Sequence, residues 1–152
     1  MVYMRLLLLA ALTVSISPAL DFCVKNEGGL ESQTLMLTLH YLRQHQDRLG
    51  TNLNPSCSAS AARITFGTVP ESPHPPDALG ATRTVGGRIL SEIRIFARAV
   101  ENQLPGASVE TRARALAKVA AHELSHYLHQ EAKHSHGLDR PVFDTQALIA
   151  LE

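Results

Sequence analysis

The chain has 152 residues, of which 45% are hydrophobic and 18% charged, a composition that fits one globular domain and excludes an intrinsically disordered chain. Fourteen lysines and arginines balance fourteen aspartates and glutamates, so no net positive charge attracts nucleic acid or an anionic membrane surface. We therefore predict a single folded domain with neither nucleic acid nor lipid as its partner, and the composition leaves the oligomeric state open.

The first residues have the pattern of a signal peptide. Arg5 precedes an apolar run over residues 6–16, and residues 17–19 (Ser-Pro-Ala) then place small side chains where signal peptidase reads them. A transmembrane helix needs about 20 apolar residues, and this run is roughly half as long. We therefore predict a signal peptide over residues 1–19 and one mature domain over residues 20–152, secreted or periplasmic and without a membrane anchor.

Export gives the two cysteines a structural meaning. Cys23 and Cys57 would enter an oxidising compartment as the only possible pair, so we predict a disulfide bond between them. Closing a loop of this size stabilises a fold by about 3 to 4 kcal/mol in the chain-entropy model. The alternative is a thiolate near the N-terminus that masks a zinc ion, and the even number of cysteines favours pairing over it.

Hydrophobic periodicity predicts the elements that follow. Residues 31–46 carry leucines at the i, i+4, i+7 spacing of an amphipathic helix, in which His40 and His45 are surface residues. Residues 62–66 alternate apolar and polar side chains, which predicts a short half-buried strand. Residues 69–87 contain four prolines and three glycines, too many for a continuous element, so a surface loop is expected there.

The second half of the chain is predicted to be mostly helical. Residues 89–100 fit both periods, and we predict a strand that runs into a helical turn. A long helix follows, for which Ser108 is the expected N-cap. A last short helix is expected over residues 146–151, with Asp144 or Thr145 as its N-cap.

The long helix is predicted to have two different faces. Its core face consists of Ala113, Leu116, Ala120, Leu124 and Leu128. A neighbouring stripe carries His122, His126 and His129. Three residues are left for solvent, namely Arg114, Lys118 and Ser125. The helix should therefore bury one face in the core and present histidines on the next.

The chemistry of the chain is concentrated in the HExxH sequence that runs from His122 to His126. Residues four apart on a helix project side by side, so the two imidazoles can reach one metal ion. Glu123 points about 100° away, which keeps its carboxylate off the metal but close to a metal-bound water that it can deprotonate. The pattern predicts a zinc site with His122 and His126 as ligands and Glu123 as general base.

A catalytic zinc takes three protein ligands and leaves one position for water, so a third ligand must follow His126. His129 would approach the metal from the same side as His126, so we expect it to line the cleft instead. His134 and His136 lie beyond the expected end of the helix, where a returning chain can bring an imidazole to the open side of the metal. His134 is the first choice, while His136 or His129 could contact the reacting carbonyl.

The segment 119–138, VAAHELSHYLHQEAKHSHGL, resembles small secreted bacterial proteins of the zincin (metzincin-like) superfamily. In these proteins an HExGHxLLG helix precedes a short loop, a His-Ser pair and then Gly-Leu-Met or Gly-Ile-Met. The resemblance implies an α+β fold in which a small twisted sheet packs over two helices, and the metal helix forms the floor of the cleft. It also implies the site residues, with Glu123 as base and three zinc ligands, His122, His126 and His134.

The same segment departs from the family pattern at four positions. Ser125 replaces the family's glycine between the two motif histidines, a change that is common among zincins and harmless. Gln130 stands where a glycine would end the helix, so residues of lower turn propensity must make the turn toward His134. Ala132 occupies the position of the usual third histidine of metzincins, and Asp139 that of a methionine. The chain is therefore not a standard metzincin.

Together these features predict a secreted zinc metallopeptidase that acts on peptides or proteins. Zinc would polarise the scissile carbonyl and activate water, and Glu123 would take the proton and pass it to the leaving amine. The substrate would lie extended along an edge strand, for which residues 89–97 are the candidate. Two alternatives remain open. The first is a zinc-binding protein without turnover, and the second is a closed structural site formed by His122, His126, His134 and His136.

Overall fold

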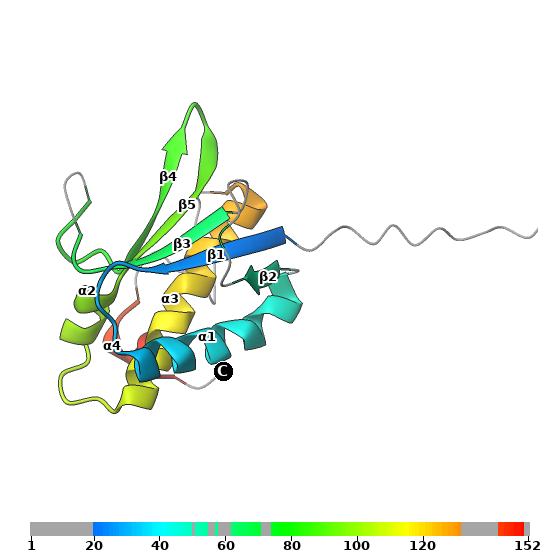
Figure 1. Cartoon of the computed structure of the whole chain (residues 1–152). Coiled ribbons are helices and arrows are strands. Elements are labelled where there is room, and N and C mark those ends of the chain that lie inside the picture. Colours follow the sequence, from blue (N-terminus) through cyan, green and yellow to red (C-terminus); the bar gives the residue numbers. More distant parts are fainter. Residues whose placement is uncertain are drawn as a thin grey trace, which may run out of the picture.

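The structure is a computed structural model that describes residues 20–49, 51–54, 57, 62–70, 74–131 and 143–150. The predicted signal peptide, residues 1–19, lies outside these residues, as do His134 and His136. The described chain has the predicted mixed α+β architecture, with one sheet packed against helices (Figure 1). Within the part of the chain that the structure describes, no helix is long and apolar enough to span a membrane.

The elements follow the order that periodicity suggests, with three further strands at residues 20–26, 51–54 and 80–85. They are β1 (Leu20–Asn26), α1 (Ser32–Leu49), β2 (Thr51–Asn54), β3 (Ala62–Gly67), β4 (Gly80–Val85), β5 (Arg88–Phe96), α2 (Ala97–Asn102), α3 (Val109–His129) and α4 (Thr145–Ile149). The predicted first helix, the strand at residues 62–66 and the strand that runs into a helical turn are confirmed as α1, β3 and β5–α2.

The strands form a five-stranded sheet in the order β2-β1-β3-β5-β4. The pairs β1–β2, β1–β3 and β3–β5 are parallel, whereas β4 runs antiparallel to β5. β4 is therefore an edge strand and β5 an interior one. The prediction that residues 89–97 form an edge strand is wrong, because β3 pairs with β5 on one side and β4 pairs with it on the other.

The prediction of a loop over residues 69–87 is also wrong, because β4 lies within it. Val85 pairs with Arg88, which leaves a two-residue turn in which Gly86 and Gly87 have φ of 58° and 80°. Positive φ at both positions is the requirement of the tight hairpin turn that matches the twist of a sheet. The two glycines that look like breakers in the sequence therefore join β4 to β5.

The hydrophobic core lies between the sheet and the helices α1 and α3, which run side by side below the sheet in Figure 1. Ile93 and Ile95 of β5 are completely buried, and Leu42 of α1 is as well. Each such side chain contributes about 1.5 to 3 kcal/mol of transfer free energy to folding. Met36 is 72% exposed, so the packed face of α1 is narrower than its run of apolar residues suggests.

A disulfide bond joins Cys23 of β1 to Cys57, as predicted, with their Cα atoms 4.8 Å apart. Cys57 follows β2 in the chain, so the bond ties the segment after one strand to its neighbour in the sheet. Such bonds persist in oxidising compartments, so the pairing is compatible with an extracellular location.

Helix α3 begins as predicted, since the Ser108 side chain accepts a hydrogen bond from the backbone N–H of Thr111 at 3.1 Å. The prediction that Lys118 and Ser125 face solvent is wrong, because both are less than 9% exposed. The Lys118 ammonium donates to the carbonyls of Ala147 and Ala150 at 2.9 and 2.5 Å, and so satisfies the end of α4. Helix α3 is thus buried around most of its circumference.

The last helix, α4, packs against α3. Its N-cap is Asp144, one of the two predicted candidates, whose carboxylate accepts from the Ala147 N–H at 2.7 Å. Phe143, directly before this cap, is 7% exposed and reaches the histidine region of α3. The capped start of α4 therefore fixes a ring against the candidate site.

Candidate metal centre

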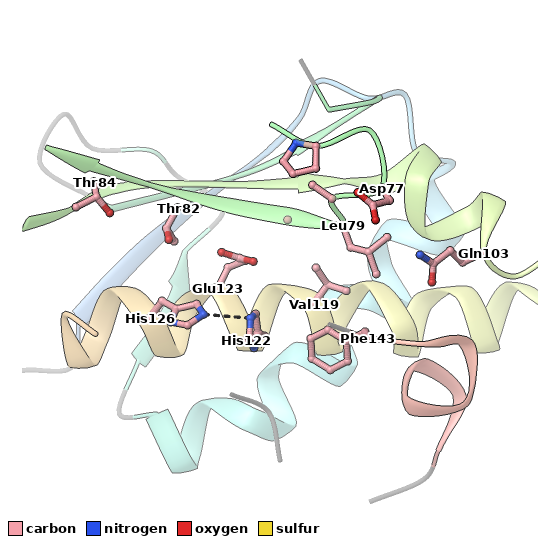
Figure 2. Close-up of a pocket in the computed structure, with 13 residues that line it drawn as sticks. Asp77, Leu79, Thr82, Thr84, Gln103, Val119, His122, Glu123, His126 and Phe143 are labelled. Carbon is pink, nitrogen blue, oxygen red and sulfur yellow. Dashed lines mark hydrogen bonds between the residues drawn. The ribbon is translucent and has the colours of Figure 1, made fainter. Parts of the chain in front are cut away.

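The two histidines of the HExxH sequence lie in the C-terminal half of α3 and face each other (Figure 2). His122 and His126 are 5% and 6% exposed, and their Nε2 atoms are 3.1 Å apart. Two nitrogens bound to a tetrahedral zinc at about 2.0 Å would lie roughly 3.3 Å apart. The pair therefore has the spacing of two ligands on one zinc ion.

Each of the two rings is oriented by a contact with another part of the chain. The Nδ1 atom of His126 lies 2.6 Å from the backbone carbonyl oxygen of Glu131, just past the end of α3. A carbonyl can only accept, so this bond puts the proton on Nδ1 and directs the lone pair of Nε2 toward His122. The ring of His122 meets Phe143 edge to face, with centroids 5.1 Å apart. Both imidazoles are thus held in place by contacts within the chain.

Glu123 lies on the same helix, and its carboxyl group extends toward β4 rather than toward the histidine nitrogens (Figure 2). It is 7% exposed, and its burial raises its pKa to about 8. A cation bound beside it would favour the charged form and lower that pKa again. Glu123 and the two histidines therefore have the helical offset that the sequence predicts.

A cleft of about 460 Å³ separates α3 from β4 and the residues before β4. Its walls are Pro75, Asp77, Ala78, Leu79, Gly80, Thr82, Thr84, Gln103, Val119, His122, Glu123, His126 and Phe143. Gly80, Thr82 and Thr84 alternate along β4, so one face of this edge strand lines the cleft opposite the histidines (Figure 2). The cleft joins residues that are more than 40 positions apart in the sequence.

This second wall was not predicted from the sequence, because the prolines and glycines of residues 69–87 favour a loop. The signal was present in the Gly86-Gly87 pair, which sits between β-branched residues on one side and the strand at residues 89–97 on the other. Phe143 was missed for another reason: a single aromatic residue before a short helix carries no pattern that points to a site 20 residues away.

The structure also tells where the other predicted site residues lie. His129, on the last turn of α3, is exposed and its Nδ1 is 2.9 Å from the carbonyl oxygen of Ser125, so it does not line the described cleft. Cys23 and Cys57 are bonded to each other, which removes the thiolate alternative. Among the described residues no group of three His, Cys, Asp or Glu side chains could hold a metal, and both His134 and His136 lie outside these residues.

The arrangement combines two aligned imidazoles, a buried carboxyl group and an open cleft. Neutral imidazole nitrogens at this spacing are suited to zinc, and a carboxyl group off the metal axis is suited to proton transfer. Comparison of the chain with models of protein families, with curated proteins and with solved structures found no match.

Proposed function

We propose that this protein is a secreted zinc-dependent peptidase that hydrolyses peptide bonds in the cleft between α3 and β4. The observation that carries the proposal is the geometry of the HExxH residues. His122 and His126 present their Nε2 atoms 3.1 Å apart in a cleft that Glu123 also lines. The resemblance of segment 119–138 to zincins supports the same assignment, as does an α+β fold with a helix as the floor of the cleft.

In this proposal the residues of α3 divide the work between binding and proton transfer. His122 and His126 hold the ion, with His134 as the third ligand and His136 as its alternative. When bound, the zinc ion supplies a Lewis acid that polarises the scissile carbonyl and lowers the pKa of water. Glu123 accepts the proton of the attacking water and later donates it to the leaving amine.

The substrate is proposed to lie along β4, which replaces residues 89–97 as the candidate edge. β4 pairs with β5 on one side, and no other described strand pairs with its second side. An extended peptide can add to such an edge through main-chain hydrogen bonds. This arrangement would hold the peptide across the cleft from the two histidines.

The decisive test is the variant Glu123→Gln, which keeps the size of the side chain but cannot accept a proton. Zinc content should stay at the wild-type level, while hydrolysis of an unfolded protein substrate should fall by about a hundredfold or more, the usual effect of losing a general base. Glu110→Gln is the matched control, because Glu110 is exposed on the first turn of the same helix, far from the cleft.

Three results would contradict the proposal, each in a different way. Loss of zinc in Glu123→Gln would make Glu123 a ligand and reject the mechanism. Zinc binding by the wild-type protein without hydrolysis of unfolded proteins or of a peptide library would identify a binding protein. A bound zinc with no exchangeable water would indicate a closed site of four histidines.

A further inference from the structure

Gly80, the first residue of β4, faces Glu123 so closely that no side chain fits between them. A Cβ atom built at Gly80 would lie 2.8 Å from Cγ and 2.9 Å from Oε1 of Glu123. It would also lie 3.0 Å from Cγ1 of Val119, one helical turn earlier on α3. Real Cβ atoms essentially never approach closer than 3.0 Å, so a side chain at this position requires something to move.

The two backbones that meet here are both fixed. Gly80 pairs with Ile95 in the ladder, and the residue before it, Leu79, accepts a hydrogen bond from the Phe96 N–H at 2.8 Å. On the other side, α3 is packed all round at this level, where Val119 is 1% exposed. The group that can yield is the Glu123 side chain, because it has three rotatable bonds and opens onto the cleft.

Backbone conformation does not explain why residue 80 is glycine. Gly86 and Gly87 in the same hairpin have positive φ and need glycine for that reason, whereas Gly80 does not have positive φ. Nor does the approach of another backbone explain it, since the three nearest atoms all belong to side chains of α3. The missing side chain leaves space, and the Glu123 carboxyl group occupies that space.

We propose that Gly80 is a positioning residue for the general base: the absence of a side chain at residue 80 keeps the Glu123 carboxyl group in its catalytic position. The inference rests on the proposed function for its catalytic meaning, although the steric relation between the two residues does not depend on it. A methyl group at residue 80 would displace the carboxyl group while leaving the histidines untouched. It should therefore reduce turnover and spare zinc binding.

The steric relation can be tested by thermal unfolding of the purified protein in a double-mutant cycle. Gly80→Ala should lower Tm by about 4 °C or more when Glu123 is present, since an overpacked contact has to be relieved. The same change in a Glu123→Ala background should shift Tm by less than half as much, because the colliding atoms are gone. If Val119→Ala, and not Glu123→Ala, reduced the loss of Tm caused by Gly80→Ala, the proposal would be overturned and Gly80 would be an ordinary packing residue.

The catalytic consequence needs a separate measurement. Gly80→Ala should lower kcat by about tenfold to a hundredfold, the effect of displacing a reacting group by up to an ångström, with KM and zinc content unchanged. Gly67→Ala in β3 is the matched control, because a Cβ there would meet only one atom, at 3.9 Å. That control should keep the wild-type kcat.

A shorter base should partly rescue the variant. Glu123→Asp withdraws the carboxyl group by one methylene, so it should cost much less kcat in the Gly80→Ala background than in the wild-type background. A Gly80→Ala protein with wild-type kcat would overturn the proposal. Failure of the wild-type chain to hydrolyse any peptide would reject the proposed function instead, while the thermal cycle would still decide whether Gly80 accommodates Glu123.

Discussion

Helix α3 and strand β4, which forms a hairpin with β5, are two walls of the cleft, and they differ in how firmly they are held. In α3 every residue from Ala115 to His126 is buried. Along β4 exposure increases toward the turn, and Val85 at its end is 51% exposed. The groups proposed to bind metal and move protons thus sit on the rigid wall, and the wall proposed to receive the peptide is an open strand edge.

At the end of α3, the side chain of Gln130 links this helix to β5 of the hairpin. Its Oε1 accepts from the Ile89 N–H at 3.0 Å, and its Nε2 donates to the Ile89 carbonyl at 3.1 Å. The amide therefore pairs with β5 as a neighbouring strand would. Gln130 does this from a left-handed conformation, with φ of 52°, at the helix end where the zincin pattern has glycine. The contrast between the walls predicts how variants in each should behave.

The largest effects should come from the proposed ligands on α3. His122→Ala or His126→Ala should abolish zinc binding, because a single helical imidazole leaves the ion mostly solvated. His129→Ala should retain zinc, since the His129 ring is bonded to the Ser125 carbonyl. Metal content after dialysis against a weak chelator, with circular dichroism to verify folding, measures the effect.

The third ligand can be identified by the same assay. If His134 is that ligand, His134→Ala should weaken zinc binding strongly while His136→Ala largely retains it. Retention by the first and loss by the second would move the ligand by two residues. Equal loss in both would instead favour a closed site of four histidines and remove the case for catalysis.

The link between the walls should give an intermediate effect. Gln130→Ala removes two hydrogen bonds to Ile89 and keeps an unfavourable left-handed conformation, so stability should fall by about 2 kcal/mol. Gln130→Gly removes the same bonds but relieves the backbone, so it should cost about 1 kcal/mol less than alanine. Urea denaturation gives both values, and the Ile89 amide should lose protection from hydrogen exchange in both. Equal destabilisation by alanine and glycine would mean that the left-handed conformation costs nothing here.

The smallest effect is expected at the start of α3, far from the hairpin. Ser108→Ala removes the N-cap bond to the Thr111 N–H and should cost about 1 kcal/mol. Ser108→Asp should keep the stability, since an aspartate can cap in the same way and also favours a helix N-terminus. Urea denaturation measures the change, and zinc content should stay unaltered in both. Loss of zinc in Ser108→Ala would show that the metal helix is less firmly held than its burial indicates.

Features that depend on residues close together in the sequence could be predicted, whereas features that depend on distant residues could not. The cap at Ser108 and the helical alignment of His122 with His126 depend on residues three or four apart, so both were predictable from spacing. The burial of Lys118 was not predictable in this way, because its partners are carbonyls of α4, 29 and 32 residues later in the chain. Whether His134 completes the site stays a prediction.

The sequence by itself determined the disulfide between Cys23 and Cys57 and the helix that carries His122, Glu123 and His126, because cysteine count and local periodicity suffice for these. The α+β class was implied by the resemblance of segment 119–138. Only the tertiary structure decided that β4 is the sheet edge and that Gly80 lies against Glu123. The physical reason is that a strand forms its hydrogen bonds with a partner elsewhere in the chain. Likewise, which side chain fills the space beside a glycine depends on how distant parts of the chain pack together.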